Sequence, residues 1–109
     1  MRSLDDADIL TVWETAHRCH PVDQALALLM GAEPECSRDD LAALPLGWRD
    51  AGLLALRAAT FGDNFSGRSI CPQCHGAVEF ELACSALRVP SAEIQETTLQ
   101  KDGYQFRLR

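Results

Sequence analysis

Two cysteines separated by two residues, Cys71 and Cys74, are the side chains whose type and spacing could do chemistry. Thiols at this spacing can reach one metal ion when the chain between them turns tightly, as in the knuckle of a zinc ribbon. Further on, Val78, Phe80 and Leu82 alternate with glutamates, which is the period of a half-buried strand. A thioredoxin-type redox pair instead needs its first cysteine at a helix N-terminus. The pattern therefore favours structural zinc, with a redox pair or a fortuitous pair as alternatives.

A closed structural zinc site almost always holds four ligands, and the Cys71–Cys74 pair supplies only two. We expect His75 to occupy a turn position beside Cys74. Cys84 could return along a hairpin to the ion, or it could be buried as a small apolar residue. Further candidate ligands are Cys36 and the group His17, Cys19 and His20, which helix capping also explains. The missing ligands could equally come from another chain, including a second copy in a homodimer, or from sequence beyond Arg109.

The composition excludes several classes of protein. The net charge of the 109 residues is −6, and no cluster of Lys or Arg offers a phosphate-binding surface, so a nucleic-acid partner is not expected. No apolar run approaches the roughly 20 residues of a membrane span. Five cysteines without a secretion signal predict reduced thiols and a cytoplasmic location, or a virion or tail-like particle if the chain is incorporated.

Residues 4–62 are expected to hold four short helices in an antiparallel bundle. We predict capping boxes at Ser3–Asp6 and Ser37–Asp40, and caps at Gly31 and Gly62. The second helix, 21–30, is apolar nearly all round, and we expect it to be buried on nearly all sides. In the fourth helix, 46–61, the expected buried set is Leu53, Leu54, Leu56, Ala58, Ala59 and Phe61.

The composition changes after Gly62. Residues 63–67 are predicted to be a turn-rich connector, and residues 77–82 and 104–108 to be strands, with a tight turn at Asp102-Gly103. The strand alternation still continues at Arg109, which predicts a missing C-terminal portion. The expected fold class is α+β, with a helical bundle over 1–62 and a zinc-ribbon-like β element with a hairpin over 63–109.

An enzyme is not expected, because the sequence has neither a nucleophile elbow nor a glycine-rich phosphate loop. Its acidic pairs lie at helix starts, where the helix dipole explains them. Tryptophans such as Trp13 and Trp48 are typical core or interface anchors. The helical spacing of Arg49, Asp50 and Arg57 is typical of a solvated or salt-bridged helix face.

Most of residues 9–82 resemble a small phage baseplate protein family, similar to the baseplate-hub assembly proteins of T-even-type phages. The resemblance rests on Trp13-Glu14, the stretches 20–29 and 44–57, Phe61-Gly62 and the Cys71–Cys74 motif. It implies a non-enzymatic structural or assembly component of the baseplate of a contractile phage tail or tail-like injection system, with other baseplate or tail proteins as partners. Family members continue with a second Cys-x-x-Cys and a helical region, which this sequence lacks. The alternative is a cytosolic zinc-ribbon adaptor or regulatory protein.

Overall fold

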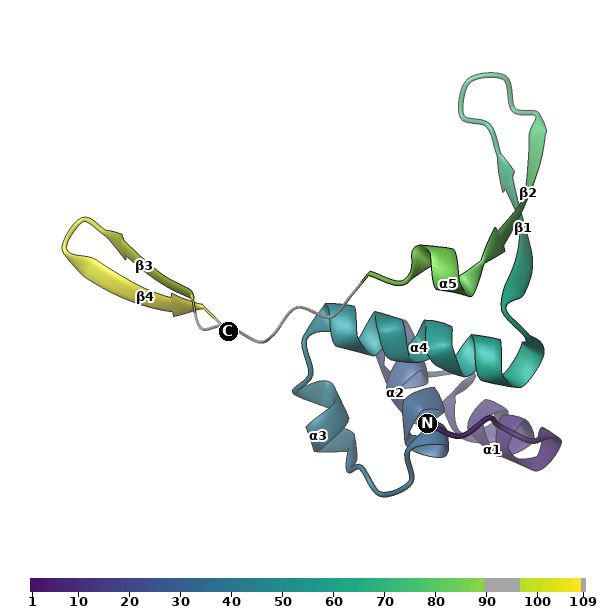
Figure 1. The fold of residues 1–109 in the computed structure, drawn as a ribbon, viewed down its shortest axis with the longest axis horizontal. Coiled ribbons are helices and arrows are strands. Elements are labelled where there is room, and N and C mark those ends of the chain that lie inside the picture. The colour runs from purple at the N-terminus through teal and green to yellow at the C-terminus, as the bar shows by residue number, and fades with distance from the viewer. Residues whose placement is uncertain (90–96, 109) are drawn as a thin grey trace.

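The computed structural model describes residues 1–89 and 97–108. In that part of the chain, four helices come first and two separate two-stranded antiparallel sheets follow, with a short fifth helix after the first sheet (Figure 1). The protein is therefore α+β, as the sequence predicts. The antiparallel geometry of the helices, their bundle arrangement and the division at residue 62 stay predictions, and residues 90–96 and 109 of the predicted β part lie outside the described residues.

Helix α1 (Asp6–Ala16) begins at a capping box two residues later than predicted. The Asp5 side chain accepts a hydrogen bond from the Asp8 backbone N–H at 2.8 Å, and the Asp8 carboxylate accepts one from the Asp5 N–H at 3.0 Å. Ser3 and Asp6 have the same three-residue spacing as Asp5 and Asp8 and could form a capping box too. Asp8, however, also pairs with the Arg2 guanidinium at 2.7 Å. This ion pair fixes Asp8 at the helix start, so the prediction of Ser3 as the cap was wrong.

Helix α2 (Pro21–Ala32) runs through Gly31, which we had predicted to end it. A Cβ at Gly31 would lie 3.3 Å from a methyl carbon of Leu4, because the N-terminal segment crosses the last turn of α2. The backbone N–H of Arg2 donates to the carbonyl of Ala32 in the same turn. Gly31 therefore provides a close approach between segments, and it does not provide a left-handed cap.

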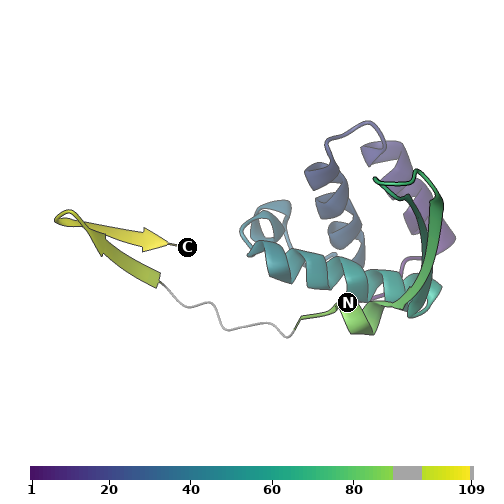
Figure 2. The same ribbon diagram turned by 90° about the horizontal axis from the view of Figure 1, so that it is seen from above.

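The hydrophobic core lies around α2, which packs against α1, α3 and α4 (Figure 2). One buried cluster joins Leu4, Ala32 and Leu56, with Ile9 and Leu28 against it; a second joins Leu26, Leu29 and Leu41, with Leu44 and Leu53 against it. The expectation that α2 is buried on nearly all sides was wrong, because Val22 and Met30 are exposed. Three neighbouring helices cover most of α2 and leave these two side chains in solvent.

Helices α3 (Arg38–Ala42) and α4 (Leu46–Phe61) follow the sequence prediction closely. Ser37 and Asp40 form the predicted capping box, and Gly62 follows α4 with φ 94°. The predicted buried set of α4 was only partly right: Leu56 is buried, whereas Ala59 and Phe61 are exposed. The reason for Phe61 is local, since its ring lies against the guanidinium of Arg57 at 5.3 Å and points away from the core.

Strands β1 (Asn64–Ile70) and β2 (Ala77–Ala83) form an antiparallel ribbon. Residues 64–67, predicted as part of a turn-rich connector, are therefore strand. The predicted strand at 77–82 is confirmed, but its apolar face is exposed and not half-buried as expected. Since Phe65 pairs with Leu82, and Gly67 with Phe80, the apolar side chains of both strands share one face.

The Phe80 ring lies directly over Gly67 on this face. A Cβ at Gly67 would lie 2.1 Å from Cζ of Phe80, so no side chain fits beneath the ring. The same ring meets Phe65 edge-on, with ring centroids 6.4 Å apart. Gly67 is thus required by the close approach of an aromatic ring.

Helix α5 (Cys84–Leu87) anchors the base of the ribbon to the end of α4. Asp63, which follows α4, accepts three hydrogen bonds from α5: its carbonyl from the Cys84 N–H at 2.7 Å, and its carboxylate from the Ser85 N–H and hydroxyl at 3.0 and 2.8 Å. Asp63 therefore caps a helix that begins more than twenty residues later in the chain. This cap joins the two ends of the ribbon.

Strands β3 (Thr97–Lys101) and β4 (Tyr104–Leu108) form the predicted hairpin. Asp102 and Gly103 both have positive φ, 53° and 80°, as a two-residue hairpin turn requires. Figure 1 draws this hairpin apart from the helices, and it pairs with no other described strand.

Candidate functional site

The Cys71–Cys74 motif forms the tip of the β1–β2 ribbon. The backbone N–H of His75 donates to the carbonyl of Cys71, and the N–H of Cys71 donates to the carbonyl of Gly76, both at 2.9 Å. These bonds close a tight turn in which His75 has φ 58°. His75 therefore occupies a left-handed turn position, as expected from its place beside Cys74.

The two thiols lie together inside this turn. The pKa of the Cys71 thiol is lowered by the nearby backbone N–H groups of Cys74 and Gln73 and by the Cys74 side chain. Backbone donors aimed at a sulfur favour the thiolate, which is the form that binds a metal ion. The pair therefore suits two of the four positions of a structural zinc site, while zinc binding itself stays a prediction.

Cys84 lies at the opposite end of the ribbon from the cysteine pair. It follows β2, whose residue Ala83 pairs with Asn64 at the base, whereas Ile70 pairs with Ala77 beside the tip. Six residue steps along a strand separate the two ends by about 20 Å. Cys84 is also fully buried, with an exposed fraction of 0%. The sequence left two alternatives for Cys84, a metal ligand or a buried small apolar residue, and its burial favours the second.

The remaining candidate ligands make local contacts in the helical region. His17 follows α1 and its Nδ1 lies 2.7 Å from the carbonyl of Trp13, while the ring of His20 accepts from the Val22 N–H at the start of α2. The Cys19 thiol donates to the carbonyl of Thr15. Cys36 is an exposed free thiol in the loop before α3. Among residues 1–89 and 97–108, no three His, Cys, Asp or Glu side chains gather where they could hold a metal ion.

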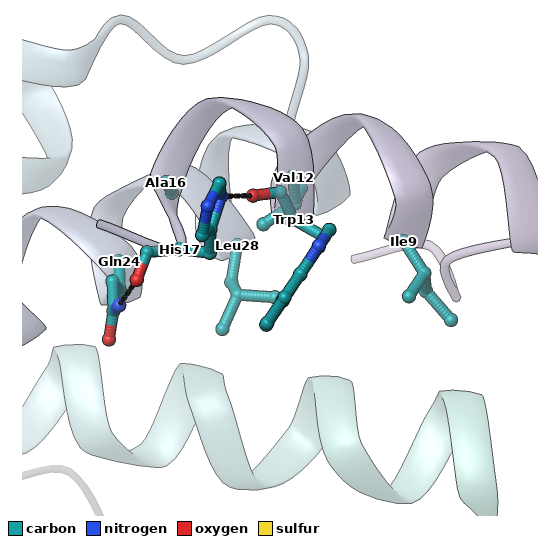
Figure 3. Close-up of a pocket in the computed structure, with 7 residues that line it drawn as sticks. All are labelled: Ile9, Val12, Trp13, Ala16, His17, Gln24 and Leu28. Atoms are coloured by element: carbon teal, nitrogen blue, oxygen red, sulfur yellow. Dashed lines mark hydrogen bonds between the residues drawn. The ribbon is translucent and has the colours of Figure 1, made fainter. Parts of the chain in front are cut away.

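An open apolar groove between α1 and α2 is the second candidate site (Figure 3). It has a volume of about 260 Å³ and is lined by Ile9, Val12, Trp13, Ala16, His17, Gln24 and Leu28. The Trp13 ring stacks on the His17 ring with centroids 4.8 Å apart, yet Trp13 remains 62% exposed. Figure 3 shows Trp13 and Leu28 side by side. The sequence placed Trp13 on the apolar face of this helix, but it could not distinguish a core residue from an exposed anchor.

The two helices that border the groove are acidic, although Arg18 follows the lining residue His17. Helices α1 and α2 contain four carboxylates, Asp6, Asp8, Glu14 and Asp23, and neither helix contains Lys or Arg. Asp8 pairs with Arg2 and Asp23 with Arg38, which leaves Asp6 and Glu14 as the acidic side chains of α1 without an ion pair among the described residues. A cationic group that approached the groove would therefore meet a favourable potential.

Arg57 was expected on a solvated or salt-bridged helix face, but it joins α4 to the ribbon. Its guanidinium lies 5.3 Å from the centroid of the Phe61 ring and 5.7 Å from that of Phe65, and it donates to the carbonyl of Gly62 at 3.3 Å. Three contacts at one junction fix how β1 leaves α4. The helical spacing of Arg57 could not reveal this role, because Phe65 was assigned to a connector.

The described chain thus combines an α+β fold with an open apolar groove at Trp13 and a cysteine pair at the tip of a two-stranded ribbon. A family model described as T4 bacteriophage base plate protein matches residues 24–109, so the chain belongs to that family. No curated protein and no solved structure shows significant similarity to this chain. No described helix is long and apolar enough to cross a membrane. Membership supports a structural role in a phage baseplate, contacts with other tail or baseplate proteins, and a place in the virion.

Proposed function

We propose that the chain is a non-enzymatic structural or assembly component of the baseplate of a contractile phage tail or tail-like injection system. The observation that carries this proposal is the family match over residues 24–109. The exposed groove gives it a physical basis, because tryptophan is enriched among the residues that dominate binding energy at protein interfaces. The chain works by docking, and it contributes binding surface to the particle.

The partner at the groove is a neighbouring baseplate protein that inserts an apolar side chain flanked by Lys or Arg. The groove lining accounts for the apolar part, since it is formed mainly by Ile9, Val12, Trp13, Ala16 and Leu28. Asp6 and Glu14, the carboxylates of α1 without an ion pair among the described residues, account for the basic flanks, since opposite charges steer association and suppress wrong partners.

The test compares two substitutions on α1. Trp13→Ala removes the groove anchor, whereas Leu10→Ala removes an apolar side chain of similar exposure, 56%, that does not line the groove. In cells that produce the complete particle, Trp13→Ala should lower incorporation of the chain at least about tenfold, because a truncated anchor costs 2 kcal/mol or more. Leu10→Ala should leave incorporation unchanged.

Helical circular dichroism of each purified variant serves as the folding control, since an exposed side chain contributes little to stability. Equal incorporation of both variants would remove the groove from the proposal. Absence of the wild-type chain from the particle and its precursors, together with salt-sensitive retention on DNA or RNA, would instead support the adaptor or regulator.

We also propose that Cys71 and Cys74 supply half of a structural zinc site that a second cysteine pair completes, from another copy of the chain or from a partner. The supporting observation is the tight turn that carries both cysteines at the ribbon tip, closed by the hydrogen bonds from His75 N–H to the Cys71 carbonyl and from Cys71 N–H to the Gly76 carbonyl, both at 2.9 Å. When bound, the ion would fix the ribbon tip against the chain that supplies the other ligands.

The zinc content per chain tests the half-site. Over a dilution series of the purified protein, zinc should be lost as a dimer dissociates, and Cys71→Ser should abolish binding at every concentration. Cys84→Ser should leave zinc content unchanged, because Cys84 is buried at the other end of the ribbon. Full occupancy in a dilute monomer would refute the half-site.

A further inference from the structure

The β3–β4 hairpin has one apolar face that nothing in the described chain covers. Its register places Leu99 opposite Phe106, so Leu99, Tyr104, Phe106 and Leu108 share a face, with Thr97 and Lys101 at its two ends. The rings of Tyr104 and Phe106 lie 6.4 Å apart. These four side chains are 48–70% exposed. The opposite face carries Thr98, Gln100, Gln105 and Arg107. Such alternation is typical of a sheet that packs on one side, and an isolated two-stranded hairpin is marginal in water.

The β1–β2 ribbon has a matching face. Phe65, Val78, Phe80 and Leu82 lie on one side, and of these Val78, Phe80 and Leu82 are exposed. The charged residues of the ribbon, Arg68, Glu79 and Glu81, lie on the other side. The hairpin face therefore offers four exposed apolar side chains, and the ribbon face offers three beside the Phe65 ring, which Arg57 contacts. Neither face carries a carboxylate of its own strands. Two such faces can pack as the two layers of a small sandwich, about 10 Å apart.

We propose that the apolar face of the β3–β4 hairpin docks on the apolar face of the β1–β2 ribbon of the same chain. The ribbon ends at Ala83, and the chain from Val89 to Thr97 can reach about 29 Å when fully extended. The ribbon itself is about 20 Å long. The hairpin can therefore reach the ribbon without a second molecule.

The size of the two faces favours this occupant over a separate protein. Since a fully exposed aromatic side chain presents about 150–250 Å², complete burial of the four hairpin side chains would remove on the order of 400 Å² from water. Together with the ribbon face, this stays below the roughly 1,200 Å² that holds two free proteins together. A covalent tether lowers the area required, because it raises the effective concentration of the hairpin to about the millimolar range.

The test measures hydrogen exchange of the β2 amides in the full chain. Phe106→Asp places a charge on the docking face, and Gln105→Asp places the same charge on the opposite face of the same strand. Exchange of the amides from Val78 to Leu82 should accelerate at least about tenfold in Phe106→Asp and stay unchanged in Gln105→Asp. The wild-type rates should be independent of protein concentration.

A second pair of substitutions, on the ribbon, is needed because Phe106→Asp could simply unfold the hairpin. Val78→Asp lies on the ribbon face and Ala77→Asp on the other side, and only Val78→Asp should accelerate exchange of the Leu99 and Phe106 amides. Equal effects of the two members of either pair would overturn the proposal. Protection that grows with protein concentration would overturn it too, and would assign the face to a second copy of the chain.

Discussion

Substitution of Gly67 by alanine gives a direct measure of how the ribbon is held together. The new Cβ would lie 2.1, 2.5 and 2.8 Å from three ring carbons of Phe80, so the ring must swing away. The ring then loses its edge-on contact with Phe65, worth about 0.5–1.5 kcal/mol. It also exposes on the order of 60 Å² of apolar surface, at a cost of about 1.5 kcal/mol.

An opposing term comes from the backbone. Glycine within a strand is less favourable than alanine by about 0.5–1 kcal/mol, because it loses more conformational freedom on folding. The ring terms are larger, so Gly67→Ala should destabilise the ribbon by about 1–2.5 kcal/mol. Gly47→Ala is the matched control: its Cβ would meet nothing within 4 Å in the first turn of α4, and it should stabilise the protein by up to about 1 kcal/mol.

Hydrogen exchange of the ribbon amides gives the local free energy, and urea unfolding gives the global one. A double-mutant cycle isolates the clash. In a Phe80→Ala background the ring is absent, so Gly67→Ala should become stabilising by about 0.5–1 kcal/mol. The same destabilisation in both backgrounds would show that the ring does not determine the glycine, and the reasoning would fail.

Two further predictions concern the helices. Leu29→Ala should lower the free energy of unfolding by about 2–5 kcal/mol, because Leu29 is buried in a core cluster with side chains of α3 and α4. The control Met30→Ala changes an exposed neighbour and should lower it by less than about 1 kcal/mol. Equal losses for the two variants in urea unfolding would contradict this core. The Arg2 side chain, with help from the Asp5 hydrogen bond, lowers the pKa of Asp8 from 3.8 to about 2. The stabilisation by this ion pair is therefore present above about pH 4 and lost as the pH falls towards 2; an NMR titration of Asp8 should show its pKa rising in Arg2→Ala, and an unchanged midpoint would exclude Arg2 as the cause.

The helical half of the fold was largely readable from local patterns. The Ser37–Asp40 capping box and the bounds of α4 follow from residues adjacent in sequence, so short-range rules sufficed. The failures have a common physical origin. The capping box of Asp5 and Asp8 is fixed by the ion pair between Asp8 and Arg2, and the role of Gly31 depends on its contact with Leu4. In both cases a neighbour in space decides between equivalent local patterns.

Strand β1 shows the same limit more strongly. Asn64, Ser66 and Gly67 have the composition of a turn, and only pairing with β2 makes them a strand. Once the register is known, Gly67 is explained by the Phe80 ring above it. The Cys-x-x-Cys spacing predicted that the thiols lie together, because this is a local property. The groove at Trp13 was out of reach, because it depends on which side chains of α2 lie opposite α1.

The ribbon geometry also bears on the proposed zinc site, because it separates the candidate ligands of this chain. The cysteine pair lies at the tip, whereas the buried Cys84 lies about 20 Å away at the base, and the contacts of Asp63 and Arg57 hold that base against α4. His17, His20 and Cys36 do not join the cysteine pair in a cluster of three or more ligands among the described residues. Ligands that complete the site must therefore come from a segment that reaches the free end of the ribbon, and a neighbouring chain in an assembled particle meets that requirement.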